Sequence, residues 1–396
     1  MHSKPTSVLI IVENLPVPFD RRVWQEARAL RDAGYRVSII CPKGRGFGKS
    51  RETLEGIEIY RHRLWEASGL LGYLLEYPWA LAAQFLLALR VYARSRFHVL
   101  QACNPPDTIF LIGRFFKLFG VRFIFDHHDL TPELYETKFQ RRDFGYKLAR
   151  WAERLTFRTA DVSIATNDSY REVALERGGM RPERTFVVRS CPDLTRIQVR
   201  PPQPALREGR RHLVVYIGVM GYQDGLDLLL DSIAFLAKQG KGEDTLFVLI
   251  GSGPEFPRLK VLAHEKGLEA RVKFTGRIPD EDVAAYFSTA AFGVAPDRAT
   301  PMNDKSTMNK ILEYMAFGLP VVLYDLTEGR RSAGEAALYA RRDDPEDFGR
   351  QMLKLLESES LRTELGARAR RRIEESLNWE NEKRALLEAY AAALGS

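Results

Sequence analysis

Short apolar runs alternate along the chain with longer segments whose apolar residues recur every three or four positions. One of these longer segments, Arg21–Ala33, places Val23, Ala27 and Leu30 on one face, which is the spacing of an amphipathic helix. Apolar runs in the first half predict strands at Val8–Val12, Val37–Cys41, Phe97–Ala102 and Val121–Phe125. Strands that are apolar throughout and separated by helices predict a parallel sheet covered on both faces, and hence an α/β fold.

The alternation stops at a proline-rich segment and then starts again. Pro201, Pro202 and Pro204 lack backbone donors and fix φ, so this stretch cannot join a sheet interior or a helix. Beyond it, strands are expected at Leu213–Gly218, Thr245–Ile250, Val272–Thr275, Phe292–Ala295 and Val321–Tyr324, with helices at Gly225–Lys238, Asp280–Thr289 and Met308–Phe317. The restart predicts a second α/β unit of the same kind.

The length of 396 residues also exceeds what one ordinary core accommodates. We therefore predict two Rossmann-like, doubly wound domains, 1–199 and 213–375, joined by a linker at 200–212. The tail is helical and charged, and we expect its last helix, 376–396, to pack back on the N-terminal domain. Sheets of this kind bind ligands at the carboxyl ends of their strands, so the prediction includes a cleft between the two domains.

Composition excludes several classes of protein. Hydrophobic residues make up 45% and charged residues 28%, the balance of a globular chain. The formal net charge of +7 suits phosphate groups or an anionic membrane face, whereas no aromatic-studded basic module points to nucleic acid. Cys41, Cys103 and Cys191 form neither a disulfide framework nor a zinc pattern. Reduced thiols and the lack of a signal peptide predict a cytoplasmic protein.

The segment Ser68–Leu89 is the one candidate for membrane contact. It is rich in Leu, Ala and aromatic residues, but Glu76, Pro78 and Gln84 interrupt it, which argues against a spanning helix. Arg90, Arg94 and Arg96 follow it. Two readings stay open: a helix buried in the core, or a helix at the inner face of a membrane with its basic end toward the lipid headgroups.

A polar loop that runs into a helix at 303–322 carries the strongest local signal. Ser306 or Thr307 is expected to cap the helix. The free N–H groups and the positive end of the helix dipole would bind an anion such as a diphosphate. Glu313, about two turns into the helix, could accept hydrogen bonds from a ribose diol. The alternative is an ordinary capped helix with Glu313 on a solvated face.

The run Lys310-Ile-Leu-Glu-Tyr-Met-Ala-Phe-Gly-Leu-Pro-Val-Val resembles the signature of retaining glycosyltransferase family 4, which has the GT-B fold. Further similar segments follow the order of that family over nearly the whole chain, at 22–37, 125–130, 216–227, 250–255 and 274–278. The resemblance implies metal-independent transfer of a sugar from a nucleotide-sugar, with UDP favoured, to a hydroxyl acceptor. The acceptor would be a lipid-linked sugar or a glycan of the cell envelope or an exopolysaccharide, with no separate cofactor.

Within this resemblance, Glu313 corresponds to the second, ribose-binding glutamate of the family's paired-glutamate motif. Lys305 stands where the first glutamate belongs, eight residues earlier. Two alternatives remain for the catalytic position: Asp304 supplies the carboxylate, or Lys305 holds a phosphate. His128 matches the family histidine beside the donor sugar and is expected at the carboxyl end of a strand.

The chain also departs from the family where the donor domain opens. Val219 and Asp224 occupy positions at which many relatives have Arg and Lys that contact the diphosphate. Lys305, Lys310, Arg330 and the helix N-terminus are then the local groups that could meet the phosphate charge.

The resemblance also implies the remaining site residues. The expected donor-binding set is Gly218, Gly253, Arg277, Ser306, Thr307, Met308, Asn309, Lys310 and Glu313. The loop after the first strand has prolines where relatives have glycines, but Asp20 and Arg21 are still expected to face the cleft, as is Arg330. No metal site is predicted, since the side chains of 126–129 point alternately to opposite faces and cannot share one ion.

Other functions fit the same residues. A nucleotide-sugar epimerase of the same fold would need no acceptor, and a nucleotide-sugar-binding protein would bind the donor without turnover. Product that depends on an added acceptor distinguishes the transferase from both.

Overall fold

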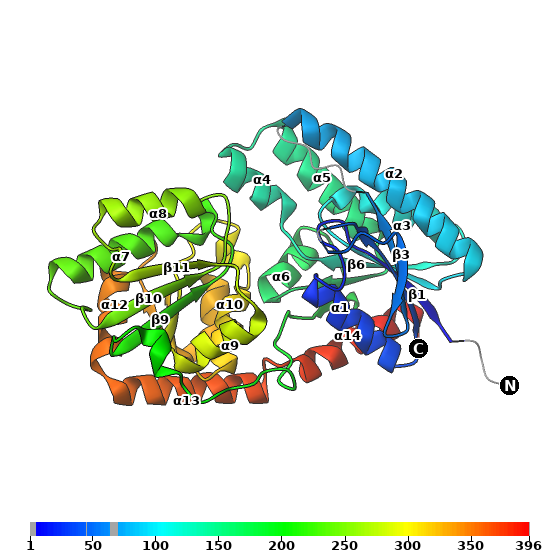
Figure 1. Ribbon diagram of the computed structural model, residues 1–396. Helices are drawn as coiled ribbons and strands as arrows, with labels where there is room; N and C mark the ends of the chain where they lie inside the picture. The colour runs from blue at the N-terminus through cyan, green and yellow to red at the C-terminus, as the bar shows by residue number, and fades with distance from the viewer. Residues whose placement is uncertain (1–4, 45, 64–69, 396) are drawn as a thin grey trace. The chain divides into compact units, whose positions relative to one another are not determined.

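The computed structural model describes residues 5–44, 46–63 and 70–395, the last of these without the side chains of 70–77. The chain forms two compact units, called unit 1 and unit 2 below. Unit 1 comprises Met1–Ser190 together with Glu382–Ser396, and unit 2 comprises Cys191–Asn381. Each is a sheet of parallel strands, with one antiparallel edge strand in unit 1, and has helices on both faces (Figure 1), which confirms the α/β class and the pair of Rossmann-like units.

In unit 1, the described residues form an eight-stranded sheet in the order β3-β4-β2-β1-β5-β6-β7-β8. Its strands are β1 (Ser7–Ile11), β2 (Arg36–Pro42), β3 (Arg51–Leu54), β4 (Ile57–His62), β5 (Val99–Cys103), β6 (Arg122–His127), β7 (Val162–Ala165) and β8 (Thr185–Val187). All neighbours pair in parallel except β3 and β4, which form an antiparallel edge. Because β1, β5 and β6 are central, their carboxyl ends meet at one edge of the sheet.

Helices cover both faces of this sheet: α1 (Arg21–Asp32), α2 (Leu70–Arg94), α3 (Phe110–Lys117), α4 (Thr131–Phe139), α5 (Phe144–Thr159), α6 (Asp168–Glu176) and α14 (Trp379–Leu394). The helix α1 buries Val23, Ala27 and Leu30, the face that its spacing predicts. Figure 1 shows α2, α3 and α5 on one side of the sheet and α1 and α14 on the other.

In unit 2, the described residues form a six-stranded, fully parallel sheet in the order β11-β10-β9-β12-β13-β14. Its strands are β9 (His212–Ile217), β10 (Thr245–Ile250), β11 (Val272–Gly276), β12 (Phe292–Ala295), β13 (Val321–Tyr324) and β14 (Ala337–Ala340). Its helices are α7 (Leu226–Lys238), α8 (Phe256–Glu265), α9 (Asp280–Thr289), α10 (Asn309–Ala316), α11 (Thr327–Ala333), α12 (Pro345–Glu357) and α13 (Glu359–Glu375). Short 3-10 turns stand at Pro204–Arg207, Tyr222–Asp224, Asn303–Lys305 and Gly334–Ala336.

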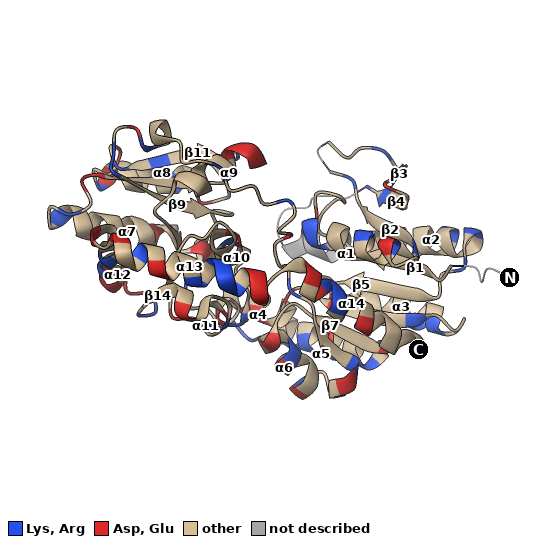
Figure 2. Cartoon of the chain, turned by 90° about the horizontal axis from the view of Figure 1, so that it is seen from below, with Lys and Arg blue, Asp and Glu red and all other residues tan. Residues whose placement is uncertain are grey.

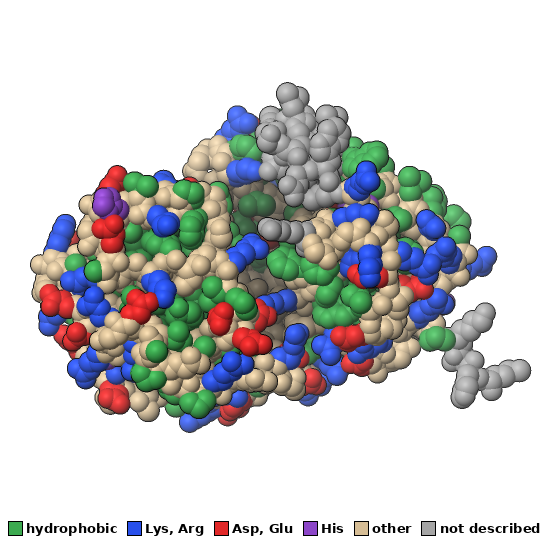
Figure 3. Space-filling model, in the orientation of Figure 1, with side chains coloured by type: hydrophobic (Ala, Val, Ile, Leu, Met, Phe, Trp, Pro, Cys, Tyr) green, Lys and Arg blue, Asp and Glu red, His purple; other side chains and the backbone are tan. Residues whose placement is uncertain are grey.

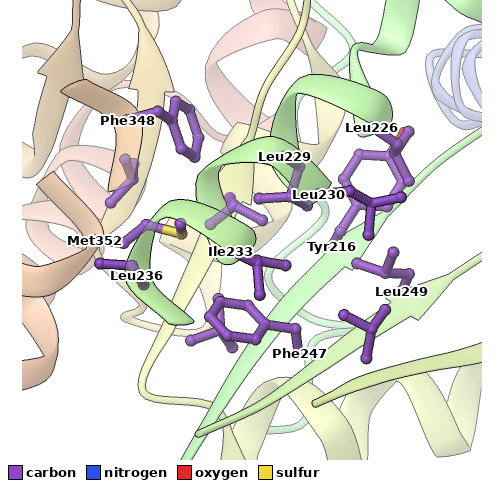
Figure 4. Close-up of a cluster of buried hydrophobic side chains, with 14 of the residues drawn as sticks. Tyr216, Leu226, Leu229, Leu230, Ile233, Leu236, Phe247, Leu249, Phe348 and Met352 are labelled. Atoms are coloured by element: carbon purple, nitrogen blue, oxygen red, sulfur yellow. The ribbon is translucent and has the colours of Figure 1, made fainter. Parts of the chain in front are cut away.

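The core of unit 2 lies on both faces of its sheet. Figure 4 shows the cluster on one face, where Leu229, Ile233 and Leu236 of α7 pack between Phe247 of β10 and Met352 of α12. This packing fixes the positions of the strand ends that carry the polar residues described below.

The division of the chain differs in detail from the predicted boundaries. It falls after Ser190, and the proline-rich stretch belongs to unit 2, where the amides of Arg200 and Gln203 donate to the hydroxyls of Ser288 (3.0 Å) and Thr289 (2.9 Å). The helical tail is two helices, α13 and α14, and α14 begins in unit 2 and continues in unit 1 from Glu382. Figure 2 shows basic and acidic residues side by side along α13.

The segment Ser68–Leu89 lies partly outside the described residues. Its remainder continues to Arg94 as α2, which buries Ala80, Gln84, Ala88 and Val91 on one side and exposes Trp79 and Leu86 on another. Within the described chain, no helix combines the length and the apolar character that crossing a membrane requires.

Candidate functional site

In unit 1, the start of α1 lies beside the carboxyl ends of β5 and β6. The Asp20 side chain caps α1 by accepting from the Val23 amide (3.1 Å), and the neighbouring Arg21 is exposed. Arg22 turns inward instead, and its side chain is only 8% exposed. The helix cap therefore directs a guanidinium into the strand ends.

Arg22 joins Asp126 and His128 in a compact cluster. One guanidinium nitrogen of Arg22 lies 2.9 Å from Asp126 Oδ1, and its Nε lies 3.0 Å from His128 Nε2. Asp126 Oδ2 is 2.8 Å from the same His128 nitrogen. A third contact ties Arg22 to the carbonyl of Val188 (2.6 Å). His128 follows β6 directly, so the strand positions the histidine and the arginine braces it.

The charges of this cluster set the protonation of His128. Burial alone would lower the pKa of His128, but the adjacent Asp126 outweighs it and raises that pKa above its ordinary value. Burial likewise acts to raise the pKa of Asp126, yet Arg22 and His128 hold it well below its usual range. Arg22 Nε donates to Nε2 when Nε2 carries no proton, and the ring proton is then on Nδ1; in the doubly protonated ring Nε2 donates to Asp126 instead. Nδ1 has no hydrogen-bond partner among the described residues, and the side chain keeps 16% exposure, so Nδ1 can donate to a ligand.

A second, fully buried layer supports Asp126. Gln101 on β5 donates to Glu26 (2.7 Å) and to Asp126 Oδ2 (2.9 Å), and it accepts from the Tyr390 hydroxyl on α14 (2.6 Å). Burial raises the pKa of Glu26 to about 8, against the opposing effect of Arg22. Near neutral pH Glu26 therefore holds a proton while Asp126 does not, so Asp126 is the one ionised carboxylate that faces Arg22 and His128.

Asn104 fixes the loop that bears His128. Its side-chain oxygen accepts from the amides of His128 (2.7 Å) and Asp129 (3.2 Å), and its side-chain nitrogen donates to the Asp129 carbonyl (2.7 Å). Asn104 also donates to Asp107 (3.1 Å), and burial raises the pKa of that carboxyl to about 7. These bonds make the backbone beside His128 rigid.

His127 points to the opposite side of the strand, as the alternation of 126–129 predicts. Its ring packs against Phe125, Phe157 and Tyr170, and burial lowers the pKa of His127 to about 3. Among the described residues, the side chains whose ligand atoms do converge, within 4.8 Å, are Cys103, Asp126 and His128. The Arg22 guanidinium already occupies this place, and its charge opposes a metal cation.

In unit 2, the expected cap of α10 is different from the observed one. The helix begins at Asn309 with Met308 as N-cap, and no side chain of the cap bonds to it. The Ser306 hydroxyl instead donates to the Met302 carbonyl (2.8 Å), which closes the preceding 3-10 turn, and Ser306 stands three positions before the first residue of the helix. Glu313 is half-buried and stands fifth in the helix, a little over one turn from its start.

Lys310, also in α10, is buried between two carboxylates. Its Nζ lies 2.7 Å from Asp297 Oδ1 and 3.6 Å from Asp224 Oδ1, and 4.8 Å from the Tyr216 ring centroid. Burial alone would lower the pKa of Lys310, but Asp297 outweighs it and raises that pKa. Burial raises the pKa of Asp224, against the effect of Lys310. The lysine charge is thus balanced within unit 2.

Two expected glycines sit where backbones approach closely. Gly218 has φ +155°, and a Cβ there would lie 2.8 Å from the Tyr216 hydroxyl and 3.4 Å from Lys310 Cε. A Cβ at Gly253 would lie 2.5–2.7 Å from the Met220 backbone. Both positions bring the loops after β9 and β10 together.

The other expected residues of unit 2 are placed as follows. Asp304 accepts from the amide (3.0 Å) and hydroxyl (2.9 Å) of Thr327 at the start of α11, and pairs with Arg342 (2.7 Å). The exposed Arg330 pairs with Asp325 (2.8 Å). Arg277 is exposed just after β11, and Lys305 and Thr307 are half-buried before α10. The structure therefore groups Gly218, Asp224 and Lys310, whereas Asp304 supports α11.

Several of these contacts could not be found from sequence. No sequence motif gives a role to Glu26, Asn104 or Asp297. Gln101 was one polar residue in an apolar strand. A buried strand that contains an amide side chain is the one signal that could have pointed to Gln101.

Comparison with known proteins agrees with this organisation. A family described as "Glycosyl transferase 4-like domain" matches residues 20–191, and one described as "Glycosyl transferases group 1" matches residues 211–358. Alpha-D-kanosaminyltransferase of Streptomyces kanamyceticus is 26% identical over 185 residues, which are 45% of this chain and 46% of that protein. The chain spans about half the length of the curated relatives it matches.

Two solved structures illustrate the shared fold. The sucrose-phosphate synthase of Thermosynechococcus elongatus superposes with a TM-score of 0.79 at 19% identity, over 98% of this chain and 99% of the other. HepE of Anabaena, solved in complex with UDP and glucose, has a TM-score of 0.72 at 15% identity, over 97% and 99% of the two chains.

Proposed function

The chain belongs to glycosyltransferase family 4 and has the GT-B fold, and from this premise we propose that it is a retaining glycosyltransferase. It moves a sugar from a nucleotide-sugar to a hydroxyl acceptor in the synthesis of a cell-envelope glycan or exopolysaccharide. We propose UDP as the nucleotide, the one bound in the HepE structure of the same fold.

The arrangement around His128 is the observation that carries this proposal. Asp126, Arg22 and Asn104 hold the imidazole at a strand end with Nε2 engaged, and Nδ1 is left to donate. In the proposed complex this donor contacts the transferred sugar. The Arg22 guanidinium and the N–H of His128 favour a substrate that becomes more negative as it reacts.

The start of α10 supports the proposed donor site. Its first-turn N–H groups are not capped by the Met308 side chain, so they suit the diphosphate, together with residues 306–309 and Lys305. Glu313 accepts from the ribose, and Arg277 lies toward the base. Because Lys310 is balanced by Asp297 and Asp224, we assign it the role of positioning the loops rather than neutralising phosphate.

The proposed reaction needs neither a metal nor a nucleophilic side chain. The bond between the sugar C1 and the phosphate oxygen breaks, and the negative charge on the leaving diphosphate is stabilised by the helix N–H groups and nearby cations. The acceptor oxygen bonds to C1 on the same face, and its proton passes to the departing phosphate oxygen. The anomeric configuration is thereby retained.

We also propose a cytoplasmic enzyme that works at the inner face of a membrane, where a lipid-linked acceptor would be found.

Sugar transfer measured by NMR tests the proposal. UDP-sugars should give a product of retained configuration only when an acceptor is added, with or without a chelator. His128→Ala should lower turnover more than tenfold, about 1.4 kcal/mol in the barrier. His264→Ala, at a 73% exposed histidine of α8, is the matched control and should leave turnover unchanged. Glu313→Gln should weaken donor binding.

Each contrary result has a clear meaning. Product formed without an acceptor would identify an epimerase, and tight donor binding without turnover would identify a binding protein. Loss of activity with a chelator that magnesium restores would contradict metal independence. Equal turnover in the two histidine variants would remove His128 from the reaction.

A further inference from the structure

Away from the strand ends, unit 1 exposes an unusual number of large apolar side chains. Among the described residues fourteen such side chains are exposed, and eight of them lie on α2, on α3 and just after it, or on α5. On α2 these are Trp79 (56% exposed) and Leu86 (65%). Figure 3 shows hydrophobic side chains gathered over α2. Single exposed apolar residues are ordinary, but a concentration on neighbouring helices marks an interaction surface.

Ring contacts show that α2 and α3 are neighbours. Phe85 of α2 lies 4.9 Å from Phe115 of α3, measured between ring centroids, and Tyr92 of α2 lies 5.9 Å from Phe119. Phe119 is itself 55% exposed, and the adjacent Leu118 is 80% exposed. The apolar surface of α2 therefore continues onto the end of α3.

The surface extends from α3 to α5. Phe110 at the start of α3 makes an edge-to-face contact with Trp151 of α5, with ring centroids 6.4 Å apart. On α5, Phe144, Leu148 and Trp151 are exposed at positions separated by four and three residues, which is one side of a helix. A helix with its apolar residues on the outer side needs a partner outside the unit.

The charges on these helices are of one sign. Exposed polar side chains between the apolar ones are basic: Arg90 and Arg94 on α2, Arg114 on α3, and Lys147, Arg150, Arg154 and Arg158 on α5. Figure 2 shows the basic residues of α2 and α3. The acidic residues of these three helices are Glu153, which is buried against Arg177, and Glu76, whose side chain is not described. Among the described side chains of the three helices, none that is exposed is acidic.

We propose that the outer surface of α2, α3 and α5 docks on the anionic face of a lipid bilayer. Tryptophan, phenylalanine and leucine enter the headgroup region while arginine and lysine meet lipid phosphates. A second copy of this chain is a poor occupant, because two such surfaces would bring cations against cations. That the lipid face also carries the acceptor rests on the proposed function, whereas the docking itself does not.

Sedimentation with vesicles tests the surface. The full chain should pellet with vesicles of phosphatidylcholine and phosphatidylglycerol at low salt, remain in the supernatant with phosphatidylcholine alone, and be released at high salt. The double variant Lys147→Glu/Leu148→Ser should lower partitioning more than about tenfold, since each cation at an anionic surface contributes. Neither residue belongs to the proposed active site, so transfer to a water-soluble acceptor should not change.

The chain offers a closely matched control. Lys260 and Val261 on α8 of unit 2 are likewise an exposed lysine followed by an exposed aliphatic residue. Lys260→Glu/Val261→Ser should bind vesicles like the unaltered chain. Equal loss in both double variants, equal binding to neutral vesicles, or no vesicle binding at low salt would overturn the proposal. A dimer in ultracentrifugation that the α5 variant alone dissolves would also overturn it, in favour of self-association.

The failures of the two proposals are separable. Vesicle binding without sugar transfer would contradict the proposed function and leave the docking surface intact. Sugar transfer without vesicle binding would contradict the docking surface and the placement at a membrane, and would leave the proposed reaction intact.

Discussion

The two units bury charge at their strand ends in opposite ways. In unit 1, Arg22 and a histidine of raised pKa face one ionised carboxylate, because Glu26 keeps its proton. In unit 2, Lys310 faces two carboxylates, Asp297 and Asp224. The cluster of unit 1 therefore has more basic groups for each ionised carboxylate than the cluster of unit 2, where one cation faces two carboxylates. The same fold thus provides two different electrostatic environments.

Removing the cation from each cluster should give the largest difference in stability between the two units. Arg22→Met leaves Asp126 buried without its main partner and should lower the free energy of unfolding of unit 1 by about 3–5 kcal/mol. Lys310→Met leaves both Asp297 and Asp224 without their cation, but it should cost unit 2 less, because the raised pKa of Asp224 lets it take up a proton and so removes its repulsion of Asp297. Hydrogen exchange followed by mass spectrometry separates the two, since it reports on peptides of each unit. Equal losses would mean that the clusters do not differ as described.

The pH dependence of stability sharpens the comparison. Glu26 in the folded chain holds its proton to a pKa of about 8, against an ordinary value of 4.5. Between these pH values Glu26 binds more proton in the folded than in the unfolded chain, so its contribution to stability falls as pH rises, with a slope approaching about 1.4 kcal/mol per pH unit. Asp107 and Glu153, each with a pKa raised to about 7, add to the slope of the unaltered chain below pH 7. Glu26→Gln should flatten this slope, as measured by exchange of unit 1 peptides from pH 5 upward.

Asp126 should make stability depend on pH in the opposite direction, and this dependence should remain in the Glu26→Gln variant. Its pKa is depressed, so the stability that it contributes is lost as pH falls through the acid range. A Glu26→Gln protein that keeps the slope of the unaltered chain above pH 5 would show that Glu26 is ionised when folded.

The smallest expected effect concerns α14. Tyr390→Phe removes the hydroxyl that donates to Gln101 and should destabilise unit 1 by about 1 kcal/mol. Tyr35→Phe is the control, since that ring touches Tyr390 at 5.7 Å while its hydroxyl has no hydrogen-bond partner among the described residues. Similar losses in the two variants would assign the effect to ring packing rather than to the hydrogen bond.

The fold was predictable where the signal was local. Apolar runs located the central strands, and the position of His128 after one of them followed from the run itself. The edge strand β3, Arg-Glu-Thr-Leu, gave no such signal because its residues are exposed or half-buried. A serine hydroxyl can cap a helix by accepting from an amide or close a turn by donating to a carbonyl, and the sequence around Ser306 does not show at which residue α10 begins.

The side-chain contacts that hold the candidate site residues in place were not predictable for a different reason. Gln101 and Tyr390 are separated by 289 positions, so no pattern along the chain relates them. Lys310 and Asp297 come from a helix and from the loop after a strand, and their pairing depends on how the sheet is ordered. Motifs identified which residues to consider, whereas their protonation and partners follow from burial.

The division of unit 1 in the sequence has a consequence for biosynthesis. Its last part, Glu382–Ser396, leaves the ribosome only after all of Cys191–Asn381 has been made, which takes roughly 10–40 s at ordinary elongation rates. During that interval the strands of unit 1 can assemble, but Gln101 lacks the hydrogen bond from the Tyr390 hydroxyl. The face of the sheet that α14 covers in the complete chain is still exposed to solvent. The nascent chain therefore completes its second unit before it can close its first.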